Sequence, residues 1–204
     1  IKEQGLVHGH DGFPVYVDSP LAIQATRVFV DNAEYCYDEE ATALLQRGIN
    51  PIGFSGLITA STADESIAIN TEPTPKVIIS ASGMCEAGRI RHHLKHNLWR
   101  PESTVLFVGY QANGTLGRAL VEGAKEVKIF GESIAVQAEI LSLPGISGHG
   151  DVHELLRWIR HFSPKPRMTF INHGEDAVCA GLAKRVSEEF GIPAIAPYSG
   201  TCFD

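Results

Sequence analysis

The amino-acid sequence predicts an α/β fold in which a parallel sheet is flanked by helices. Short apolar runs rich in β-branched residues alternate with amphipathic segments along most of the 204 residues. This strand–helix alternation favours parallel strands with helices on both faces. Turns containing glycine or serine follow several of the runs, and sites in such sheets gather at these carboxyl ends of strands. A chain of this length can bury a substantial core, as one large domain or two small ones.

The first part of the chain, residues 1–133, is expected to form one domain of this kind. Ser19 and Asp38 carry the side chains that helix N-caps require. Thr62 and Glu65 have the spacing of a capping box. The predicted strands are 14–18, 76–81, 104–109 and 126–130. The predicted helices are 20–30, 39–45, 63–69, 86–97 and 115–123.

The pattern changes near residue 133, so residues 134–204 are expected to form a second domain. An apolar run at 136–144 predicts a longer strand, and a helix is expected after it from Val152 to Phe162. The remaining predicted elements are a strand at 167–172, a helix at 176–190 and a short strand at 194–197.

Composition and charge argue against some classes of protein. The formal net charge is −7, which disfavours indiscriminate nucleic-acid binding because phosphate contacts depend on Lys and Arg. No apolar run is long enough to cross a bilayer, so no membrane association is expected. The cysteines are scattered with no CxxC pair, which favours reduced thiols in a cytoplasmic protein over a disulfide framework or a zinc ribbon.

Two consecutive strand ends carry Ser- or Gly-rich turns that lead into arginine-bearing helices. Such a turn presents backbone N–H groups at a helix N-terminus, which suits an anion. The second turn begins like a phosphate-binding loop, but Thr115 stands where that loop needs Lys, so a Walker-type nucleotide site is not expected. Two turns in succession suit an extended polyanion better, although solvated helix faces are the alternative interpretation. The candidate residues are Ser80, Ser82, Gly83, Arg89, His92, His93, Gln111, Thr115 and Arg118.

Other potential catalytic groups fit less well. Ser82 and Cys85 lack the nucleophile-elbow sequence that either would need as a catalytic nucleophile. The HGHDG stretch at 8–12 is interpreted as a solvated loop, because no closing His follows it. His92 and His96 lie one helical turn apart, but two ligands do not make a closed zinc site.

Two histidines occupy matching positions in consecutive strand–helix units. His149 lies in SGHGD and His173 lies in NHGE, each in a Gly-flanked turn after an expected strand. Asp151 is expected to cap the helix that follows His149. Matching strand ends bring side chains toward one cleft, so a shared site and two structural histidines both remain open from the residues alone.

Five motifs resemble, in this order, the β-CASP group of metallo-β-lactamase-fold nucleases, which includes ribonuclease J. The motifs are VDSPLA, SASGMCEAGRIRHHL, GYQANGTLGRAL, ISGHGD and NHGE. The resemblance extends from about Pro14 to Ser199 and is greatest to the RNA-directed members. It implies that residues 1–133 are the β-CASP domain. It also implies that residues 134–204 are the last strand–helix units of a metallo-β-lactamase αββα fold.

The resemblance implies a zinc-dependent ribonuclease that hydrolyses phosphodiester bonds. In such an enzyme His149 would be the general acid for the leaving oxygen, Asp18 would orient and charge it, and His173 would be a zinc ligand. A His at a helix N-terminus feels the positive end of the helix dipole, which disfavours imidazolium, so a carboxylate partner is what such an acid needs. The candidate residues of the two turns would hold RNA phosphates.

The family's HxHxDH motif and its remaining metal ligands are absent from this sequence. We therefore expect a piece of the nuclease without its N-terminal metallo-β-lactamase half, unable to complete a two-zinc site and inactive alone. The alternative is a non-catalytic RNA-binding or assembly module that pairs with a separate half. Apolar surface near 134–143 and 167–172 is expected to be exposed, which makes a homodimer a reasonable expectation. A small-molecule enzyme is disfavoured because no dinucleotide fingerprint is present.

Overall fold

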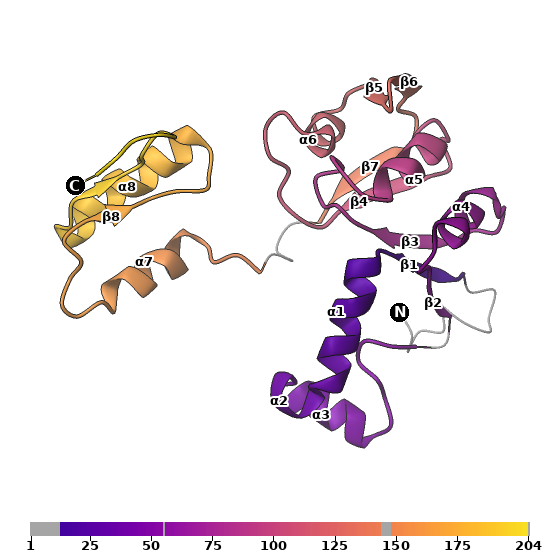
Figure 1. The fold of residues 1–204 in the computed structure, drawn as a ribbon, viewed down its shortest axis with the longest axis horizontal. Helices are drawn as coiled ribbons and strands as arrows, with labels where there is room; N and C mark the ends of the chain where they lie inside the picture. The colour runs from indigo at the N-terminus through magenta and orange to yellow at the C-terminus, as the bar shows by residue number, and fades with distance from the viewer. Residues whose placement is uncertain (1–12, 55, 144–147, 204) are drawn as a thin grey trace. The chain divides into compact units, whose positions relative to one another are not determined.

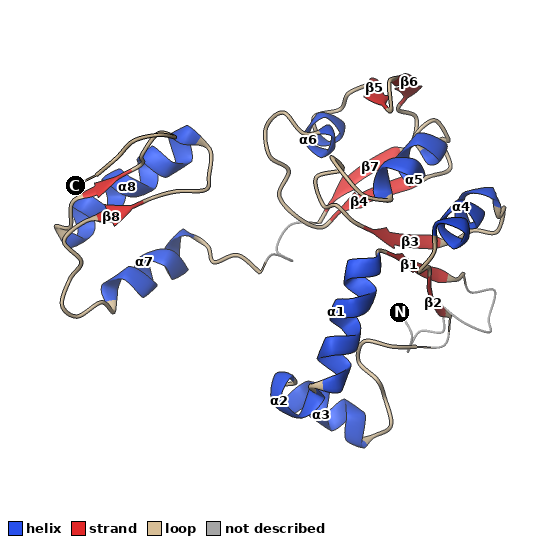
Figure 2. Cartoon of the chain, viewed as in Figure 1, coloured by secondary structure: helices blue, strands red, loops and turns tan. Residues whose placement is uncertain are grey.

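The computed structural model describes residues 13–54, 56–143 and 148–203, and the chain forms two compact units, 1–146 and 147–204. Each unit has a hydrophobic core of its own. Both contain parallel strand pairs with helices beside them, so the predicted α/β fold class is confirmed (Figures 1 and 2). The prediction of a solvated loop at 8–12 lies outside the described residues.

The larger unit begins with a parallel sheet and the helices that follow its strands. The elements are β1 (Val15–Asp18), α1 (Pro20–Asp31), α2 (Ala33–Cys36), α3 (Glu39–Gln46), β2 (Leu57–Thr59), α4 (Ala63–Thr71) and β3 (Val77–Ser80). The sheet order is β2–β1–β3, and Asp18 at the end of β1 lies opposite Ser80 at the end of β3. α1 begins directly after β1 because Ser19 accepts a hydrogen bond from the N–H of Ala22 and Pro20 fixes the first helical φ.

The larger unit continues with the elements that build its core. These are α5 (Ile90–Asn97), β4 (Thr104–Phe107), α6 (Leu116–Val121), β5 (Glu126–Ile129), β6 (Glu132–Ala135) and β7 (Glu139–Ser142). β4 pairs with β7 in parallel, and β5 and β6 form an antiparallel hairpin. Ile90, Leu94 and Leu98 recur every four residues, which places them on the face of α5 that packs into the core. Leu120 of α6 and Ile129 of β5 are completely buried there.

Within the predicted strand at 136–144 the structure has only the shorter strand β7, and the preceding strand, β6, ends at Ala135. Between them the chain crosses to the end of α5, where Gln137 and Ala138 both donate their N–H groups to the carbonyl of Leu98. Apolar periodicity does not reveal this crossing, because the residues on both sides of it suit a strand. β7 then pairs with β4, within the larger unit. The expected domain boundary near 133 stays a prediction.

The smaller unit is built from two helix–strand segments. Its elements are α7 (Val152–Arg160), β8 (Thr169–Phe170), α8 (Asp176–Phe190) and β9 (Ala194–Ile195). β8 and β9 pair in parallel. Leu156 and Ile159 of α7 pack against Val186 of α8 in a small core. Asp151 caps α7 as predicted, and Glu154 completes a capping box.

The other sequence-based expectations on helix starts and thiols also hold. Asp38 accepts a hydrogen bond from the N–H of Ala41, and Thr62 and Glu65 form a complete capping box. The four cysteines are free thiols. In the part of the chain that the structure describes, no helix has the length and apolar character needed to span a bilayer.

Candidate functional site

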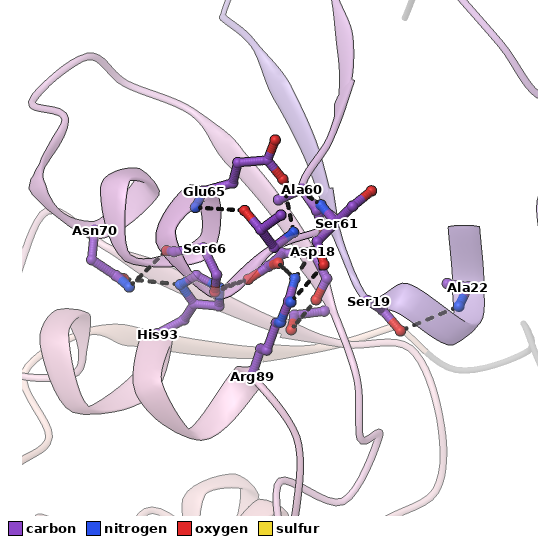
Figure 3. A network of polar contacts seen from close by, with 12 residues as sticks. Asp18, Ser19, Ala22, Ala60, Ser61, Glu65, Ser66, Asn70, Arg89 and His93 are labelled. Carbon is purple, nitrogen blue, oxygen red and sulfur yellow. Dashed lines mark hydrogen bonds and ion pairs between the residues drawn. The ribbon is translucent and has the colours of Figure 1, made fainter. Parts of the chain in front are cut away.

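Asp18 is completely buried at the carboxyl end of β1, and its carboxylate is the centre of a polar network (Figure 3). Oδ1 accepts a hydrogen bond from Nη1 of Arg89 at 2.6 Å. Oδ2 accepts from Oγ of Ser66 at 2.5 Å and lies 2.6 Å from Nε2 of His93. The backbone carbonyl of Asp18 accepts from Oγ of Ser80 at 2.9 Å. Every oxygen of Asp18 therefore has a partner within the larger unit.

Elements distant in sequence meet in this network. Asp18 and Ser80 end neighbouring parallel strands, which finish at the same edge of the sheet. Arg89 is the N-cap of α5 and His93 follows one turn later, so both side chains project from one side of that helix. Ser66 comes from the buried side of α4. The network thus joins α4 and α5 to the end of β1.

Arg89 binds the backbone as well as the carboxylate. Its Nη1 donates to the carbonyl of Ala60 at 2.8 Å, and its Nη2 donates to the carbonyl of Ser61 at 2.9 Å. Both carbonyls follow β2, so the guanidinium connects the ends of β1 and β2 to α5. The Arg89 side chain remains 21% exposed while that of Asp18 is at 0%. Arg89 is therefore the member of the ion pair that solvent, or a ligand, reaches.

The two neighbouring histidines of α5 have different surroundings. His93 is buried; its Nε2 faces Asp18, and its Nδ1 lies 2.9 Å from Oδ1 of Asn70. Asn97 donates to the carbonyl of His93 at 2.8 Å and closes this side of the network. His92 is exposed. RNA contact by either histidine stays a prediction, and for His93 it would require displacing a partner inside the protein.

The pKa values of the buried pair follow from burial and hydrogen bonding. Burial acts to raise the pKa of Asp18, but the hydrogen bonds from Ser66, His93 and Arg89 together outweigh it and lower that pKa. Burial is also the largest influence on His93 and lowers its pKa, although the hydrogen bond and charge of Asp18 act in the opposite direction. Near neutral pH, Asp18 is ionised and Arg89 carries the compensating positive charge.

Sequence reasoning missed Ser66 and Asn70, two members of the network. They lie four residues apart on α4, so both project toward α5 from one face of the helix. Asn70 also donates from Nδ2 to the carbonyl of Ser66 at 3.4 Å. The available signal was this i, i+4 spacing of polar residues directly after the capping box. A polar pair on a short helix is usually interpreted as its solvated face, and here the same face is buried.

The end of β3 and the turn between β3 and α5 hold three of the predicted anion-binding residues. Ser80 is bonded to the neighbouring strand, and Ser82 accepts a hydrogen bond from the N–H of Ala87 at 3.3 Å. Gly83 is exposed, and its carbonyl accepts from Nε2 of Gln111 at 3.0 Å. Internal hydrogen bonds therefore brace this turn, and its RNA contacts stay a prediction.

The second predicted turn, between β4 and α6, is closed by its own side chains. Gln111 is buried, and its Nε2 donates to the carbonyls of Gly83 and Gly109. Thr115 caps α6 by accepting a hydrogen bond from the N–H of Arg118 at 3.2 Å. Gln111 therefore joins the two turns from within. RNA binding by Gln111, Thr115 and Arg118 stays a prediction.

The first N–H groups of α6 already have acceptors in the chain. Leu116 donates to the carboxylate of Glu86, and Gly117 donates to the carbonyl of Met84 at 3.1 Å. Glu86 thus occupies the position at a helix start that a phosphate oxygen would take. This internal carboxylate is a contact that the glycine pattern of the turn did not predict.

His173 stands in a strained turn after β8. Its backbone is left-handed, with φ of 66°, and such strain in a non-glycine residue is concentrated at functional sites. The residue is exposed and lines a cavity of about 130 Å³ with Asp176 and Tyr198. Gly174 follows it, and a Cβ there would lie only 2.9 Å from Sγ of Cys179. Packing against Cys179 therefore requires glycine at 174, whereas the backbone at 173 does not itself favour His.

His149 is exposed in the turn before α7. Asp151 accepts a hydrogen bond from the N–H of Glu154 at 2.8 Å, and this bond lowers the pKa of Asp151. The carboxylate nearest to His149 in sequence is therefore committed to the helix cap. This agrees with the prediction that Asp151 is structural.

Among the residues that the structure describes, no group of three His, Cys, Asp or Glu side chains is arranged to hold a metal ion. His173, Asp176 and Cys179 line one cavity but do not form such a group. The described residues therefore do not by themselves fit a zinc site.

Comparison with protein families shows two successive family matches along this chain. The Beta-Casp domain family matches residues 2–120 of the 204, and the family described as a Zn-dependent metallo-hydrolase RNA specificity domain matches residues 133–197. The chain belongs to the β-CASP family of metallo-β-lactamase-fold ribonucleases. The predicted resemblance is thereby confirmed.

Curated relatives of this β-CASP chain come from bacteria and archaea. Ribonuclease TTHA0252 of Thermus thermophilus is 37% identical over 87% of the chain and 40% of the relative. An RNase J-like protein of Methanocaldococcus jannaschii is 35% identical over 92% of the chain and 42% of the relative. Transcription termination factor FttA of Methanosarcina mazei is 30% identical over 88% of the chain and 29% of the relative. The chain thus spans less than half the length of these relatives.

Proposed function

We propose that this β-CASP chain is the RNA-binding part of a zinc-dependent RNA-processing nuclease that hydrolyses phosphodiester bonds in the cytoplasm. The observation that carries the proposal is the succession, along one chain, of the Beta-Casp match and the RNA specificity match. Relatives whose names contain ribonuclease or RNase support RNA as the substrate. The isolated chain is proposed to be inactive, because the sequence contributes one ligand to a site that uses two zinc ions.

His149 is proposed as the group that protonates the leaving oxygen. Its exposure in a turn whose backbone is fixed by the α7 capping box supports this role. A general acid in this position must keep its proton although the helix dipole disfavours imidazolium. It therefore requires a negatively charged group nearby. The assignment of Asp18 as that partner remains part of the proposal.

The contacts of Asp18 favour an additional, positioning role. Its carboxylate is completely buried and bonded to Arg89, His93 and Ser66. A carboxylate held in this way orients Arg89, whose side chain is partly exposed. We propose that Arg89 meets RNA phosphate while Asp18 fixes the position of its guanidinium.

His173 is proposed as the zinc ligand of this chain. Its side chain is exposed and its backbone is left-handed, next to a glycine that has no room for a side chain. Strained backbone of this kind is concentrated at functional sites, which supports the role as a ligand. The remaining ligands would come from the metallo-β-lactamase half that the relatives' greater length accommodates. Two ions in the intact enzyme are part of the proposal.

Exposed apolar side chains support a protein partner for the chain. Leu141 and Leu143, in and after β7, are 45% and 44% exposed. Met168 and Phe170 of the smaller unit are 42% and 48% exposed. Surfaces of this kind are covered in an assembly. The metallo-β-lactamase half is the proposed partner, and a homodimer is the alternative.

A second candidate function is a non-catalytic RNA-binding or assembly module. The family description of residues 133–197 as an RNA specificity domain supports RNA binding that does not itself require catalysis. Addition of a metallo-β-lactamase half separates the two: the nuclease proposal requires RNA cleavage to appear, whereas the module would bind RNA and remain inactive.

Calorimetric titration with zinc, combined with RNA binding measured by fluorescence anisotropy, tests the main proposal. The chain is expected to bind RNA, to leave it uncleaved and to bind no zinc at micromolar concentration. The variants His173→Ala and, as an exposed control in the same unit, His153→Ala are then compared. Tight zinc binding that His173→Ala abolishes and His153→Ala preserves would mean that the chain completes a metal site itself, against the proposal.

A further inference from the structure

The turn of the β5–β6 hairpin places an aromatic residue in a backbone conformation that is energetically unfavourable for a bulky side chain. Phe130 and Gly131 form its turn with φ of 53° and 81°, a left-handed pair typical of tight hairpins. Glycine or asparagine is usual at such positions, because a bulky side chain is disfavoured there. Phe130 nevertheless keeps 46% of its surface exposed. Core packing therefore does not explain why a large ring occupies this turn.

Two residues of α5 hold the ring in place. Cζ of Arg91 lies 4.5 Å from the centroid of the Phe130 ring, and the His92 ring lies 4.6 Å away between centroids, tilted by 34°. Lys95, one turn further along α5, forms a 2.6 Å ion pair with Glu132 at the start of β6. The hairpin (Figure 1) is therefore fixed to α5 at its turn and at the start of β6, and the ring is held in place.

Arg91, which packs on this ring, also lines a cavity of about 360 Å³. Lys128 lines it as well, and is an exposed residue of β5, two positions before Phe130. Nη1 of Arg91 reaches the carbonyl of Glu86 only at 3.4 Å, and its Nε has no acceptor among the described residues. Arginine has five N–H donors, so most of its donor capacity is unused here. Glu126 also lines the cavity and is a suitable acceptor for a base amino group.

We propose that Phe130, Arg91 and Lys128 form a subsite for one nucleotide of single-stranded RNA. The base stacks on the exposed surface of Phe130, and Lys128 and Arg91 hold the adjacent phosphate. Unpaired strands are the form that fits, because their bases can leave the stack and present a face to an aromatic side chain. This subsite rests on the proposed RNA-binding function. Phe130 and Lys128 lie outside the two glycine-rich turns that the sequence indicated, and both turns contribute to the lining of the adjacent cavity.

Binding of a short fluorescent single-stranded RNA, measured by anisotropy over a range of salt concentrations, tests the subsite. Phe130→Leu keeps an apolar side chain against α5 but removes the ring, and it is expected to weaken binding roughly tenfold. Tyr35→Leu is the matched control, because Tyr35 is an aromatic residue of the same unit that is 83% exposed on α2. It is expected to leave the affinity unchanged. Lys128→Ala is expected to weaken binding and to reduce the salt slope by about one unit.

The outcomes separate this inference from the function on which it rests. If the unmodified chain binds RNA and Phe130→Leu binds equally well, the subsite is wrong and the proposed function stands. If the unmodified chain does not bind RNA, the proposed function is wrong and the subsite falls with it. If Phe130→Leu does not fold, the exposed Lys128 decides, since an unchanged affinity and salt slope in Lys128→Ala would overturn the subsite.

Discussion

Nη1 of Arg89 lies 2.6 Å from Oδ1 of Asp18, a carboxylate with no exposed surface. A buried charge is tolerated only when a counter-charge and hydrogen bonds replace its hydration. Ser66 and His93 supply the other hydrogen bonds to this carboxylate. Because these partners come from α4 and α5, the arrangement of both helices on the sheet depends on one negative charge.

Removal of that charge is expected to destabilise the larger unit. Asp18→Asn leaves Arg89 without its counter-ion and is expected to lower the free energy of unfolding by about 3 kcal/mol, as when one partner of a buried pair is removed. Urea denaturation followed by circular dichroism measures the change. Asp31→Asn, at the exposed end of α1, is the control and is expected to change stability little. Equal stabilities for the two variants would contradict the role of Asp18.

Stability is expected to fall on acidification in two steps. Burial lowers the pKa of His93 below 6.5, so the unfolded chain binds a proton that the folded chain does not, and stability decreases as pH falls below about 6.5. The pKa of Asp18 is also lowered, so its contribution is present above about pH 3.8 and is lost as pH falls further. His93→Gln is expected to flatten the upper step relative to the unmodified chain. A urea-unfolding series between neutral and mildly acidic pH that is identical in both would contradict this assignment.

The turn after His173 is expected to reject any side chain at the next position. A Cβ on Gly174 would lie 2.9 Å from Sγ of Cys179, so Gly174→Ala is expected to cost about 1–2 kcal/mol through overpacking. Cys179→Ala removes the obstructing sulfur, and a double-mutant cycle by thermal unfolding is expected to show coupling between the two sites. Gly181→Ala in α8, where a Cβ meets nothing within 4 Å, is expected to stabilise the helix slightly. Additive effects at 174 and 179 would contradict the steric explanation.

The left-handed backbone of His173 predicts a difference between two substitutions that both remove the imidazole. His173→Gly relieves the cost of a φ of 66°, whereas His173→Ala retains it. The glycine variant is expected to be more stable than the alanine variant by about 1 kcal/mol. Differential scanning calorimetry of the two variants measures this difference. The opposite order would mean that the turn does not hold this conformation in solution.

The helix starts of this protein were predictable because an N-cap is a local interaction. Each capping side chain bonds a backbone N–H group two or three residues away, so a short window of sequence contains the whole interaction. The caps at Ser19, Asp38, Thr62 and Asp151 all occur as expected. The strand predicted at 136–144 was placed too early for the opposite reason, since the structure has β7 only at Glu139–Ser142. Its late start depends on hydrogen bonds from Gln137 and Ala138 to the carbonyl of Leu98, which no periodicity in that window encodes.

The candidate site was predictable as a set of motifs but not as a set of contacts. Motif resemblance correctly gave the family and selected Asp18. The strand-end turns separately selected Arg89, without indicating that it binds Asp18. The same turns predicted two phosphate-binding sites, yet Gln111 is buried between them and Glu86 occupies the start of α6. The identity of a polar residue in a motif does not show whether its side chain faces a ligand or forms hydrogen bonds within a loop. Only the packing in the structure distinguishes the two.

The contact between Asp18 and His93 spans 75 positions of the chain. Closing a loop of that length costs about 4 kcal/mol of free energy through lost chain entropy. The contact stabilises the fold only after this loop has closed. We therefore expect the network to form late in folding, after α5 has packed onto β4 and β7. Substitutions at Asp18 should then act mainly by accelerating unfolding, with little effect on the refolding rate. The same buried carboxylate that orders the site would in this way set how long the larger unit stays folded once it has formed.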